Sequence, residues 1–356
     1  MRIVVLGLSL SSSWGNGHAT TFRALLSAFA ARSHEILFLE RDVPWYAANR
    51  DLDAPGYCRL AFYDSIEALE RWRGEIAAAD AVIVGSYVPE GIAVGGLVQQ
   101  WASGVTAFYD IDTPVTLARL AAGDCDYVSP DVIAGYDLYL SFTGGPTLGW
   151  IERTYGVPAA RALYCSVDPD AYRRIDAEPR WDLSYLGTYS ADRQPTLDAL
   201  LIEVARRMPE RRFAVAGPQY PADIAWPANV ERIEHLPPAE HPAFYSASRY
   251  TLNVTRADMI RAGWSPSVRL FEAAACATPI ISDIWPGIES VLQPGRDILL
   301  ARTGEEVIAA LGREGREIGE SARARVLAGH SARRRAEELE TWLAEARGHL
   351  PLARAS

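Results

Sequence analysis

The sequence predicts an α/β fold with two domains, each built on a parallel sheet. Short, continuous apolar runs alternate with amphipathic segments along most of the 356 residues. Such runs are typical of strands that are buried on both faces of a parallel sheet, with helices between them. A segment with three prolines, residues 157–181, interrupts the alternation, which then restarts. At about 150 residues per domain, the length also favours two domains.

The first half of the chain predicts a doubly wound sheet, because its strands and helices alternate. The expected strands are Arg2–Leu8, Glu35–Leu39, Tyr57–Phe62, Ala81–Gly85, Val105–Tyr109 and Leu138–Phe142. The expected helices are Ala19–Ala31, Ser65–Ala79, Gly91–Ala102 and Pro146–Tyr155. We therefore expect a first domain at residues 1–165 and a connecting segment at residues 166–180.

The second half repeats the pattern and predicts a second domain at residues 181–330. Its expected strands are Leu183–Leu186, Phe213–Ala216, Val230–His235, Thr251–Val254, Pro279–Ser282 and Ile298–Ala301. Its expected helices are Gln194–Arg206, Ala239–Ser246 and Ser267–Ala275, followed by successive helices from Gly304 to about Arg347. Residues 331–356 form a C-terminal helix and tail. Two α/β domains joined in this way are expected to face each other across a cleft, where small ligands usually bind.

Charge and composition exclude several classes of protein. All 35 basic residues are Arg, against 45 acidic residues, which gives a net charge of −10. A nucleic-acid groove needs a concentrated positive face, which this balance argues against. No apolar run reaches the ~18 residues of a transmembrane segment, and the four scattered Cys residues suggest neither a zinc site nor a disulfide framework. We therefore expect a cytoplasmic protein that binds no nucleic acid.

The two halves differ in charge. Residues 1–178 hold 13 Arg and 22 acidic residues, whereas residues 179–356 hold 22 Arg and 23 acidic residues. The second half is therefore the better host for an anionic ligand, although chance variation of the surface would give the same difference.

The first candidate motif is a loop, Ser9–His18, between the first strand and the first helix. Its Asn16 and Gly17 allow backbone N–H groups to approach an anion at the positive end of the helix. The dinucleotide fingerprint G-x-G-x-x-G is absent, because position 20 is Thr, and this argues against a nicotinamide dehydrogenase. The alternative is a simple flexible turn.

The second candidate motif is Asp110-x-Asp112, at the carboxyl end of a buried strand, where open α/β sheets bind their ligands. Paired carboxylates suit a hard metal ion. Alternate residues of an extended segment point in opposite directions, however, so Asp112 and Thr113 are also candidates for capping the next helix.

The third candidate motif is a polar loop that leads into a helix. Ser267 is a plausible N-cap, and Arg269 in the first turn, together with the helix N-terminus, could hold a diphosphate. Glu272 lies one turn further, at a reach suited to two ribose hydroxyls. The alternative for Glu272 is an acid on the helix surface.

This third motif resembles the nucleotide-sugar signature of GT-B glycosyltransferases, especially retaining family 4. Residues Glu272–Ile281 read EAAACATPII, similar to the family pattern E-A-x-A-x-G-x-P-V-I. Further matches follow the family order: Cys165–Tyr172, Leu186–Tyr189, Val215–Pro218 and His235–Pro237. The strings Asn253–Met259 and Ser265–Cys276 are most similar to the CgeB-like (spore-maturation) subgroup.

The resemblance implies a GT-B fold, with two Rossmann-like domains across a cleft and a tail helix that packs back on the first domain. It implies a metal-independent, retaining transfer from a nucleoside-diphosphate sugar (UDP- before dTDP- or GDP-) to an unknown glycan, protein or lipid-linked acceptor. The implied donor-binding residues are Asn16, Gly17, Gly187, Thr188, Arg193, Gly217, His235, Leu236, Ser265, Ser267, Val268, Arg269 and Glu272. The implied catalytic residues are Asp110, Asp112 and His18, with Asp110 facing the anomeric carbon. No cofactor or metal is expected.

The sequence also departs from the family. Trp264 stands where the first of two family glutamates would fall, Thr188 replaces an Arg, and Ala277 replaces a glycine that ends the helix. Arg193 matches the downstream basic residue, and Arg269 could supply the missing charge. These departures keep two alternatives open: a sugar-nucleotide epimerase of the same fold, and a protein that binds nucleotide sugars without catalysis.

Overall fold

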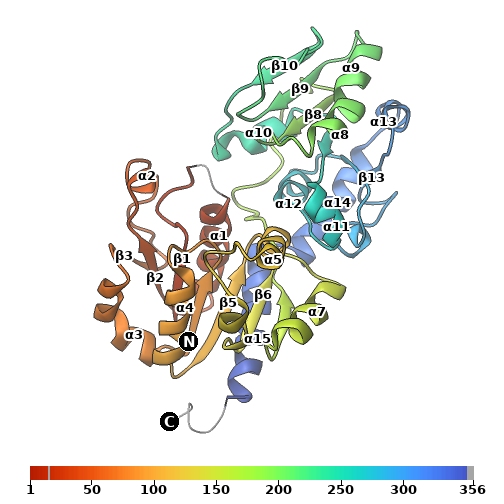
Figure 1. The fold of residues 1–356 in the computed structure, drawn as a ribbon. Helices are drawn as coiled ribbons and strands as arrows, with labels where there is room; N and C mark the ends of the chain where they lie inside the picture. Colours follow the sequence, from red (N-terminus) through yellow and green to blue (C-terminus); the bar gives the residue numbers. More distant parts are fainter. Residues whose placement is uncertain (15–16, 351–356) are drawn as a thin grey trace. The chain divides into compact units, whose positions relative to one another are not determined.

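The chain forms two compact units in a computed structural model that describes residues 1–14 and 17–350 (Figure 1). The first unit comprises Met1–Ser166 and Ala332–Ser356, and the second comprises Val167–Ser331. The chain therefore leaves the first unit once and returns to it for its last helix.

The first unit is built on a parallel sheet, which has seven strands among the described residues, in the order β3-β2-β1-β4-β5-β6-β7. The strands are β1 (Arg2–Gly7), β2 (Glu35–Arg41), β3 (Arg59–Tyr63), β4 (Ala81–Gly85), β5 (Val105–Asp110), β6 (Leu138–Ser141) and β7 (Ala160–Ala162). Alternate residues of β1 enter separate cores: Val4 and Leu6 lie in one, Ile3 and Val5 in the other. The sheet is thus covered on both faces, as its continuous apolar strands predict.

Helices cover both faces of this sheet (Figure 1). They are α1 (His18–Ala30), α2 (Pro44–Ala47), the 3-10 helix Glu67–Trp72, α3 (Arg73–Ala78), α4 (Gly91–Trp101), α5 (Thr113–Ala122), α6 (Pro130–Ala134), α7 (Pro146–Tyr155) and α15 (Ala332–Gly348). The last of these, α15, packs against α1 and β5. Its Leu339 and Leu343 share a core with Phe22 and Leu26 of α1.

The second unit is built on another parallel sheet, with six strands in the part of the chain that the structure describes, ordered β10-β9-β8-β11-β12-β13. Its strands are β8 (Leu183–Leu186), β9 (Phe213–Ala216), β10 (Val230–Ile233), β11 (Thr251–Asn253), β12 (Ile280–Ser282) and β13 (Leu299–Leu300). Its helices are α8 (Gln194–Leu197), a π-helical turn (Asp198–Ile202), α9 (Glu203–Arg207), the 3-10 helix Pro238–Glu240, α10 (His241–Ser246), α11 (Ala257–Ala262), α12 (Val268–Ala275), the 3-10 helix Ile288–Ser290, α13 (Gly304–Leu311) and α14 (Arg316–Gly329).

The predicted fold class is confirmed: both sheets are parallel and alternate with helices. Several elements were missed, namely β7, α5 and the short helices α2, α6 and α11. The strand β7 lies inside the three-proline segment, residues 157–181, that interrupts the alternation in the sequence, and it pairs with β6 through Ala160–Ala162. Three residues are too few to show a recognisable apolar run.

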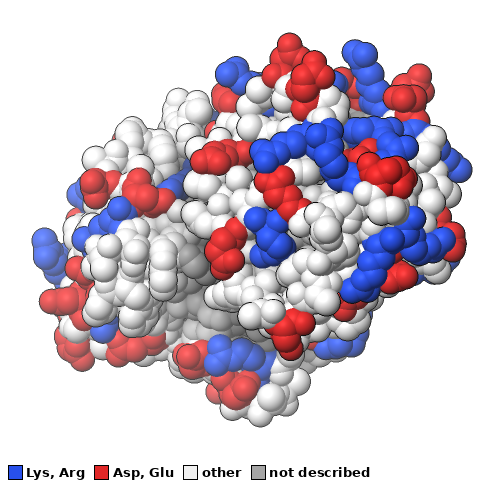
Figure 2. All heavy atoms as spheres, turned by 90° about the horizontal axis from the view of Figure 1, so that it is seen from above, with Lys and Arg blue, Asp and Glu red and all other residues white. Residues whose placement is uncertain are grey.

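The residues expected to form a connecting segment, 166–180, are also partly ordered against the second unit. Val167 forms a bridge with Ser331, and Tyr172 is buried. No helix among the described residues is long and apolar enough to cross a membrane. On the face shown in Figure 2, arginine and acidic side chains are interspersed.

Candidate functional site

In the second unit, two glycines bring the carboxyl ends of β8 and β9 close together. Gly217 has φ +136°, and an added Cβ atom there would lie 2.2 Å from the carbonyl oxygen of Gly187. An added Cβ atom at Gly187 would lie 2.7 Å from an Arg269 nitrogen and from the Tyr185 hydroxyl. Only glycine combines this backbone conformation with so close an approach. Gly187 and Gly217, both predicted to bind the donor, therefore allow the backbone to pack closely against itself and against Arg269.

Arg269 is buried in the first turn of α12, where three groups fix its guanidinium. Its Nε donates to the carbonyl oxygen of Leu186, its Nη1 donates to Oδ1 of Asn253 (3.0 Å), and its Cζ lies 4.7 Å from the centre of the Tyr185 ring. An arginine held in this way is oriented before any ligand arrives, which favours a directed contact with an anion.

Asn253 organises this part of the site, although the sequence analysis assigns it no role. Its Oδ1 accepts hydrogen bonds from Arg269 and from the Ser267 hydroxyl (2.8 Å), and its Nδ2 donates to the Ser282 hydroxyl (2.9 Å). Ser267 occupies the N-cap position of α12, but its side chain makes no capping hydrogen bond. The predicted N-cap position is therefore confirmed, but the Ser267 hydroxyl holds Asn253 instead of capping the helix.

Arg193 adds a second positive charge beside Arg269. Its Nη2 donates to the carbonyl oxygen of Thr188 (2.5 Å), and its buried Nε has no hydrogen-bond partner among the described residues. Burial lowers the pKa of Arg193, and the charges of Arg269 and Arg256 lower it further, while Tyr185 opposes them. A buried arginine with other arginines nearby is a site where an anion would be favoured.

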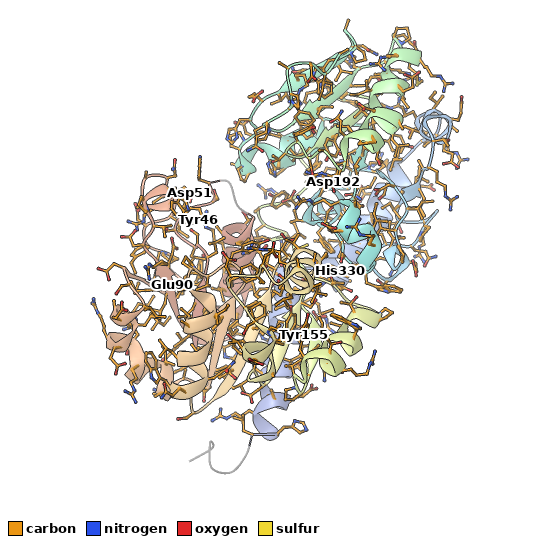
Figure 3. The ribbon with its side chains drawn as sticks, viewed as in Figure 1. Tyr46, Asp51, Glu90, Tyr155, Asp192 and His330 are labelled. Carbon is orange, nitrogen blue, oxygen red and sulfur yellow. The ribbon has the colours of Figure 1, made fainter. Side chains whose placement is uncertain are left out.

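One carboxylate lies beside this arginine cluster. Asp192, labelled in Figure 3, accepts hydrogen bonds from the Ser190 hydroxyl and from the backbone N–H of Ala257 (2.9 Å). Burial raises the pKa of Asp192, but these hydrogen bonds and the charges of Arg256 and Arg193 outweigh it and leave the pKa below its ordinary value. Asp192 thus offsets part of the positive charge while it ties α11 to the loop after β8.

Glu272 lies one turn further along α12 and is buried, so it is not an acid on the helix surface. Its Oε2 accepts a hydrogen bond from the Tyr245 hydroxyl (3.2 Å) and lies 3.7 Å from Nδ1 of His241. Burial raises the pKa of Glu272, but interactions with His241, Tyr172 and Tyr245 outweigh it, and the pKa lies below its ordinary value. Glu272 is therefore an ionised, well-supported carboxylate.

The remaining donor-site candidates of the second unit differ in burial and in their contacts. Ser265 is buried and donates to the carbonyl oxygen of Gly263 (3.1 Å), whereas Val268 is 40% exposed at the start of α12. The Leu236 carbonyl oxygen lies 3.2 Å from Nε2 of His241, while His235 and Thr188 are exposed. The structure thus brings Leu236 close to the Glu272 cluster through His241.

Trp264, which stands at the position of a family glutamate, has an unusual backbone conformation. Its φ is +45°, its N–H donates to the carbonyl oxygen of Pro286 (2.6 Å), and an added Cβ atom at Gly287 would lie 2.4 Å from the indole ring. Left-handed backbone is costly for a bulky residue and persists where the surroundings enforce it. The departure from the family is therefore built into the local packing.

A further aromatic cluster escaped the sequence analysis. The Arg232 guanidinium stacks on Tyr220 (4.2 Å to the ring centre) and on Trp226 (4.8 Å), and its Nη2 donates to the carbonyl oxygen of Gly217 (2.9 Å). The Tyr220 hydroxyl donates to the carbonyl oxygen of Gly187 (3.1 Å). These residues come from separate segments, so no local sequence pattern predicts that they form a cluster.

In the first unit, a buried carboxylate shapes the first loop. Glu40, at the end of β2, accepts hydrogen bonds from the backbone N–H of Leu10 (2.6 Å) and from both the N–H and the hydroxyl of Ser11 (2.9 and 2.6 Å). The Ser9 hydroxyl adds a fourth, at 3.2 Å. The first part of this loop is therefore organised by a buried acid, Glu40, that the sequence did not single out.

Asp110, which the resemblance expects to face the sugar, is fully buried at the end of β5. Its Oδ1 accepts from the Thr116 hydroxyl (2.6 Å), and its Oδ2 accepts from the Tyr139 hydroxyl (2.5 Å). Burial raises the pKa of Asp110 to about 6, although these hydrogen bonds oppose it. Both carboxylate oxygens of Asp110 therefore accept hydrogen bonds from residues of its own unit.

Asp112 and His18 lie nearer the surface of the first unit. Asp112 is half-buried at the N-cap position of α5, without a side-chain capping bond, and accepts a hydrogen bond from the Tyr87 hydroxyl (3.1 Å). Gly17 is the N-cap of α1, and His18 is the first residue of that helix. Asn16 lies outside the described residues.

His18 has unused hydrogen-bonding capacity. Its ring is 9% exposed and packs edge-on against Tyr87 at 5.4 Å, and its buried Nδ1 has no partner within residues 1–14 and 17–350. Burial lowers the pKa of His18 to about 4, so the ring is neutral at pH 7. A neutral ring with an unused nitrogen can accept a proton, whereas the carboxylate of Asp110 is fully buried and already accepts two hydroxyl hydrogen bonds.

Comparison with known proteins adds the family of one segment. Residues 193–341 match a family described as glycosyl transferase-like. No curated protein matches the chain.

Solved structures show the fold of the whole chain. Sucrose-phosphate synthase from Thermosynechococcus elongatus is 14% identical, with TM-score 0.68 and coverage of 97% of this chain and 99% of that one. HepE from Anabaena, solved with UDP-glucose, is 11% identical, with TM-score 0.66 and coverage of 97% and 100%. An α-glucosyltransferase, solved with UDP-glucose and DNA, is 12% identical, with TM-score 0.71 and coverage of 97% and 99%. The chain thus has the GT-B fold of these structures, and its residues 193–341 match the glycosyl transferase-like family.

Proposed function

We propose that the protein transfers a sugar from a nucleoside-diphosphate sugar, with UDP-glucose as the first donor to test, to a separate acceptor. The observation that carries the proposal is the arginine cluster of the second unit. There, Arg193 and Arg269 lie beside the N-terminus of α12, and the ionised carboxylate of Glu272 follows one turn later. HepE and the α-glucosyltransferase were solved with UDP-glucose, which supports the choice of donor. We also propose that the chain belongs to the CgeB-like subgroup of these enzymes.

The proposed division of labour follows from the charges of these groups. Arg193 and Arg269, with the N-terminal amides of α12, hold the diphosphate, because donors aimed in advance at the leaving group stabilise the charge that develops there. Glu272 accepts hydrogen bonds from the two ribose hydroxyls. The backbone around Leu236 lines the place of the base, and the aromatic cluster around Arg232 borders Gly187.

We assign the proton-accepting role of the first unit to His18 rather than to Asp110. The unused Nδ1 of His18 and its low pKa supply a neutral acceptor at pH 7. A positioned acid or base contributes typically 10²- to 10⁴-fold to a rate. The transfer proposed here retains the configuration of the donor sugar, needs no metal ion, and involves oxocarbenium character at the anomeric carbon.

Two alternative functions keep the same nucleotide site. An epimerase would consume the donor without an acceptor, and a binding protein would consume none. Trp264 would favour a binding protein without catalysis if its backbone conformation kept the donor sugar out of the nucleotide site. A donor-consumption assay with and without a panel of glycan, protein and lipid-linked acceptors separates the three functions.

The donor site is tested by calorimetric titration of UDP, dTDP and GDP into the protein and into Glu272→Ala. The lost charged hydrogen bonds amount to roughly 1.5–3 kcal/mol, so UDP binding should weaken about 10- to 100-fold. Glu317→Ala, which removes an exposed carboxylate of α14, is the matched control and should bind normally. Equal affinity of Glu272→Ala and the unaltered protein would contradict this assignment.

A further inference from the structure

His241 contacts three parts of the second unit that are distant in sequence. Its Nε2 lies 3.2 Å from the carbonyl oxygen of Leu236, and its Nδ1 lies 3.2 Å from the Tyr172 hydroxyl and 3.7 Å from Oε2 of Glu272. Tyr172 comes from the segment that follows the boundary between the units, whereas Glu272 comes from α12. His241 itself begins α10.

The chemistry of these partners fixes how the ring is used. A carbonyl oxygen can only accept a hydrogen bond, so Nε2 must carry the proton that it donates to Leu236. In the neutral ring, Nδ1 is then an acceptor, and the Tyr172 hydroxyl donates to it. When the ring is protonated, Nδ1 donates instead, and Oε2 of Glu272 is the carboxylate oxygen that faces it. In either state, the ring limits where the Glu272 carboxylate can turn.

Glu272 needs such support because it is only 7% exposed. A buried carboxylate is costly unless hydrogen-bond donors surround it, and its orientation is then set by those donors. Tyr245 donates to Oε2 from the other side at 3.2 Å. Binding two vicinal hydroxyls requires that the carboxylate plane be held still, so the neighbours of Glu272 bear directly on nucleotide affinity.

We propose that His241 is a positioning residue, held by Tyr172 and by the Leu236 carbonyl, that sets the orientation of Glu272 for the ribose diol of the nucleotide. The inference rests on the proposed function, since it needs Glu272 to bind ribose. It goes beyond that function because it gives roles to His241 and Tyr172, to which the proposed function assigns none. It also makes the segment after the first unit part of the support of the nucleotide site.

The test uses the full chain and two ligands, UDP and 2′,3′-dideoxy-UDP, which lacks both ribose hydroxyls. The ratio of their dissociation constants reports the contribution of the diol alone. In the unaltered protein, dideoxy-UDP should bind roughly 10- to 100-fold more weakly than UDP. In Glu272→Gln the ratio should fall close to one, because the charged acceptor is lost.

Two substitutions of the histidine then separate its two nitrogens. The amide of His241→Asn replaces Nδ1, which faces Glu272, and the amide of His241→Gln replaces Nε2, which faces Leu236. We expect His241→Gln and His241→Ala to reduce the ratio to a few-fold, and His241→Asn to retain most of it. Affinity for dideoxy-UDP should change less than threefold in all three variants. Tyr172→Phe should reduce the ratio by a smaller factor.

The control is His34→Asn, which alters a second histidine–glutamate pair (His34 Nε2 to Glu340 Oε1, 3.2 Å) in the first unit. It should leave both dissociation constants unchanged. A high ratio in the unaltered protein that persists in His241→Gln and His241→Ala would overturn the role of His241 while leaving the nucleotide site intact. A ratio of one in the unaltered protein, or no UDP binding at all, would instead overturn the proposed function on which the inference rests.

Discussion

The two candidate regions lie at the carboxyl ends of parallel strands in their own units, yet they differ in how their charges are satisfied. In the second unit, the Nε of Arg193 has no hydrogen-bond partner within residues 1–14 and 17–350, and other arginines lie nearby. In the first unit, the buried acid Asp110 has both oxygens engaged, and His18 is neutral. The comparison shows that one type of sheet edge can present either an incompletely compensated charge or neutral hydrogen-bonding groups. Unused hydrogen-bonding capacity, more than residue type, identifies the groups available to a ligand.

The largest effect is expected at the positive side of this comparison. Arg193→Ala should lower kcat about 10²- to 10³-fold, because a pre-oriented donor to the leaving diphosphate is lost. Steady-state kinetics with UDP-glucose and an identified acceptor measure it. Arg316→Ala, an exposed arginine of α14, should turn over normally. Normal turnover of Arg193→Ala would remove the arginine cluster from the reaction.

The next effect ranks the two groups of the first unit. His18→Ala should lower kcat about 10²-fold, the usual scale for a proton acceptor, whereas Asp110→Asn should lose less than about tenfold because its carboxylate is already engaged. Since burial lowers the pKa of His18 to about 4, its protonation should not limit the rate between pH 5 and 8. Loss of turnover in Asp110→Asn, with activity kept in His18→Ala, would restore the assignment made from the sequence.

A third expectation concerns stability and follows from the raised pKa of Asp110, about 6. In the folded protein, Asp110 binds its proton more tightly than in the unfolded chain, so its contribution to the free energy of unfolding falls as the pH rises from about 4 to 6. For a pKa difference of about two units, this fall is about 3 kcal/mol. The free energy of unfolding, measured in urea, should therefore rise in Asp110→Asn relative to the unaltered protein by about this amount between pH 4 and 7. A constant difference between the two proteins would contradict the burial argument. Asp131→Asn, at an exposed site on α6, is the control.

The smallest expected effect is none: turnover should be unchanged by EDTA. The arginines and the N-terminus of α12 supply the positive charge that a metal would otherwise provide. The measurement is turnover before and after chelation, followed by addition of Mg²⁺ or Mn²⁺. If chelation abolished turnover and either ion restored it, the carboxylates of Asp110 and Asp112 would return as candidate ligands.

The sequence predicted the fold class well because continuous apolar strands and intervening helices reflect burial directly. It also picked out Glu272 and Arg269, which the structure shows buried in one helix. It did not find roles for His241, Asn253 or Glu40, since these act through contacts between segments far apart in the chain. No local sequence pattern predicts these contacts, which are seen only in the folded structure.

The burial of Asp110 was not predicted either, for a related reason. A strand end predicts which edge of a sheet a residue occupies, but not whether its side chain turns outward or into the unit. Tyr139 on the neighbouring strand and Thr116 on the next helix decide that Asp110 turns inward. Neither partner is distinguished in the sequence from other hydroxyl residues.

The return of the chain to the first unit has a consequence for synthesis on the ribosome. Residues 332–348 form α15, whose Leu339 and Leu343 complete a core started by Phe22 and Leu26 some 300 positions earlier. The second unit, residues 167–331, is translated in full before α15 exists. Until α15 is made, the part of this core that Leu339 and Leu343 complete stays open to solvent, although α1 can already cover its share of the same face. Apolar surface left open in this way during synthesis favours binding by chaperones.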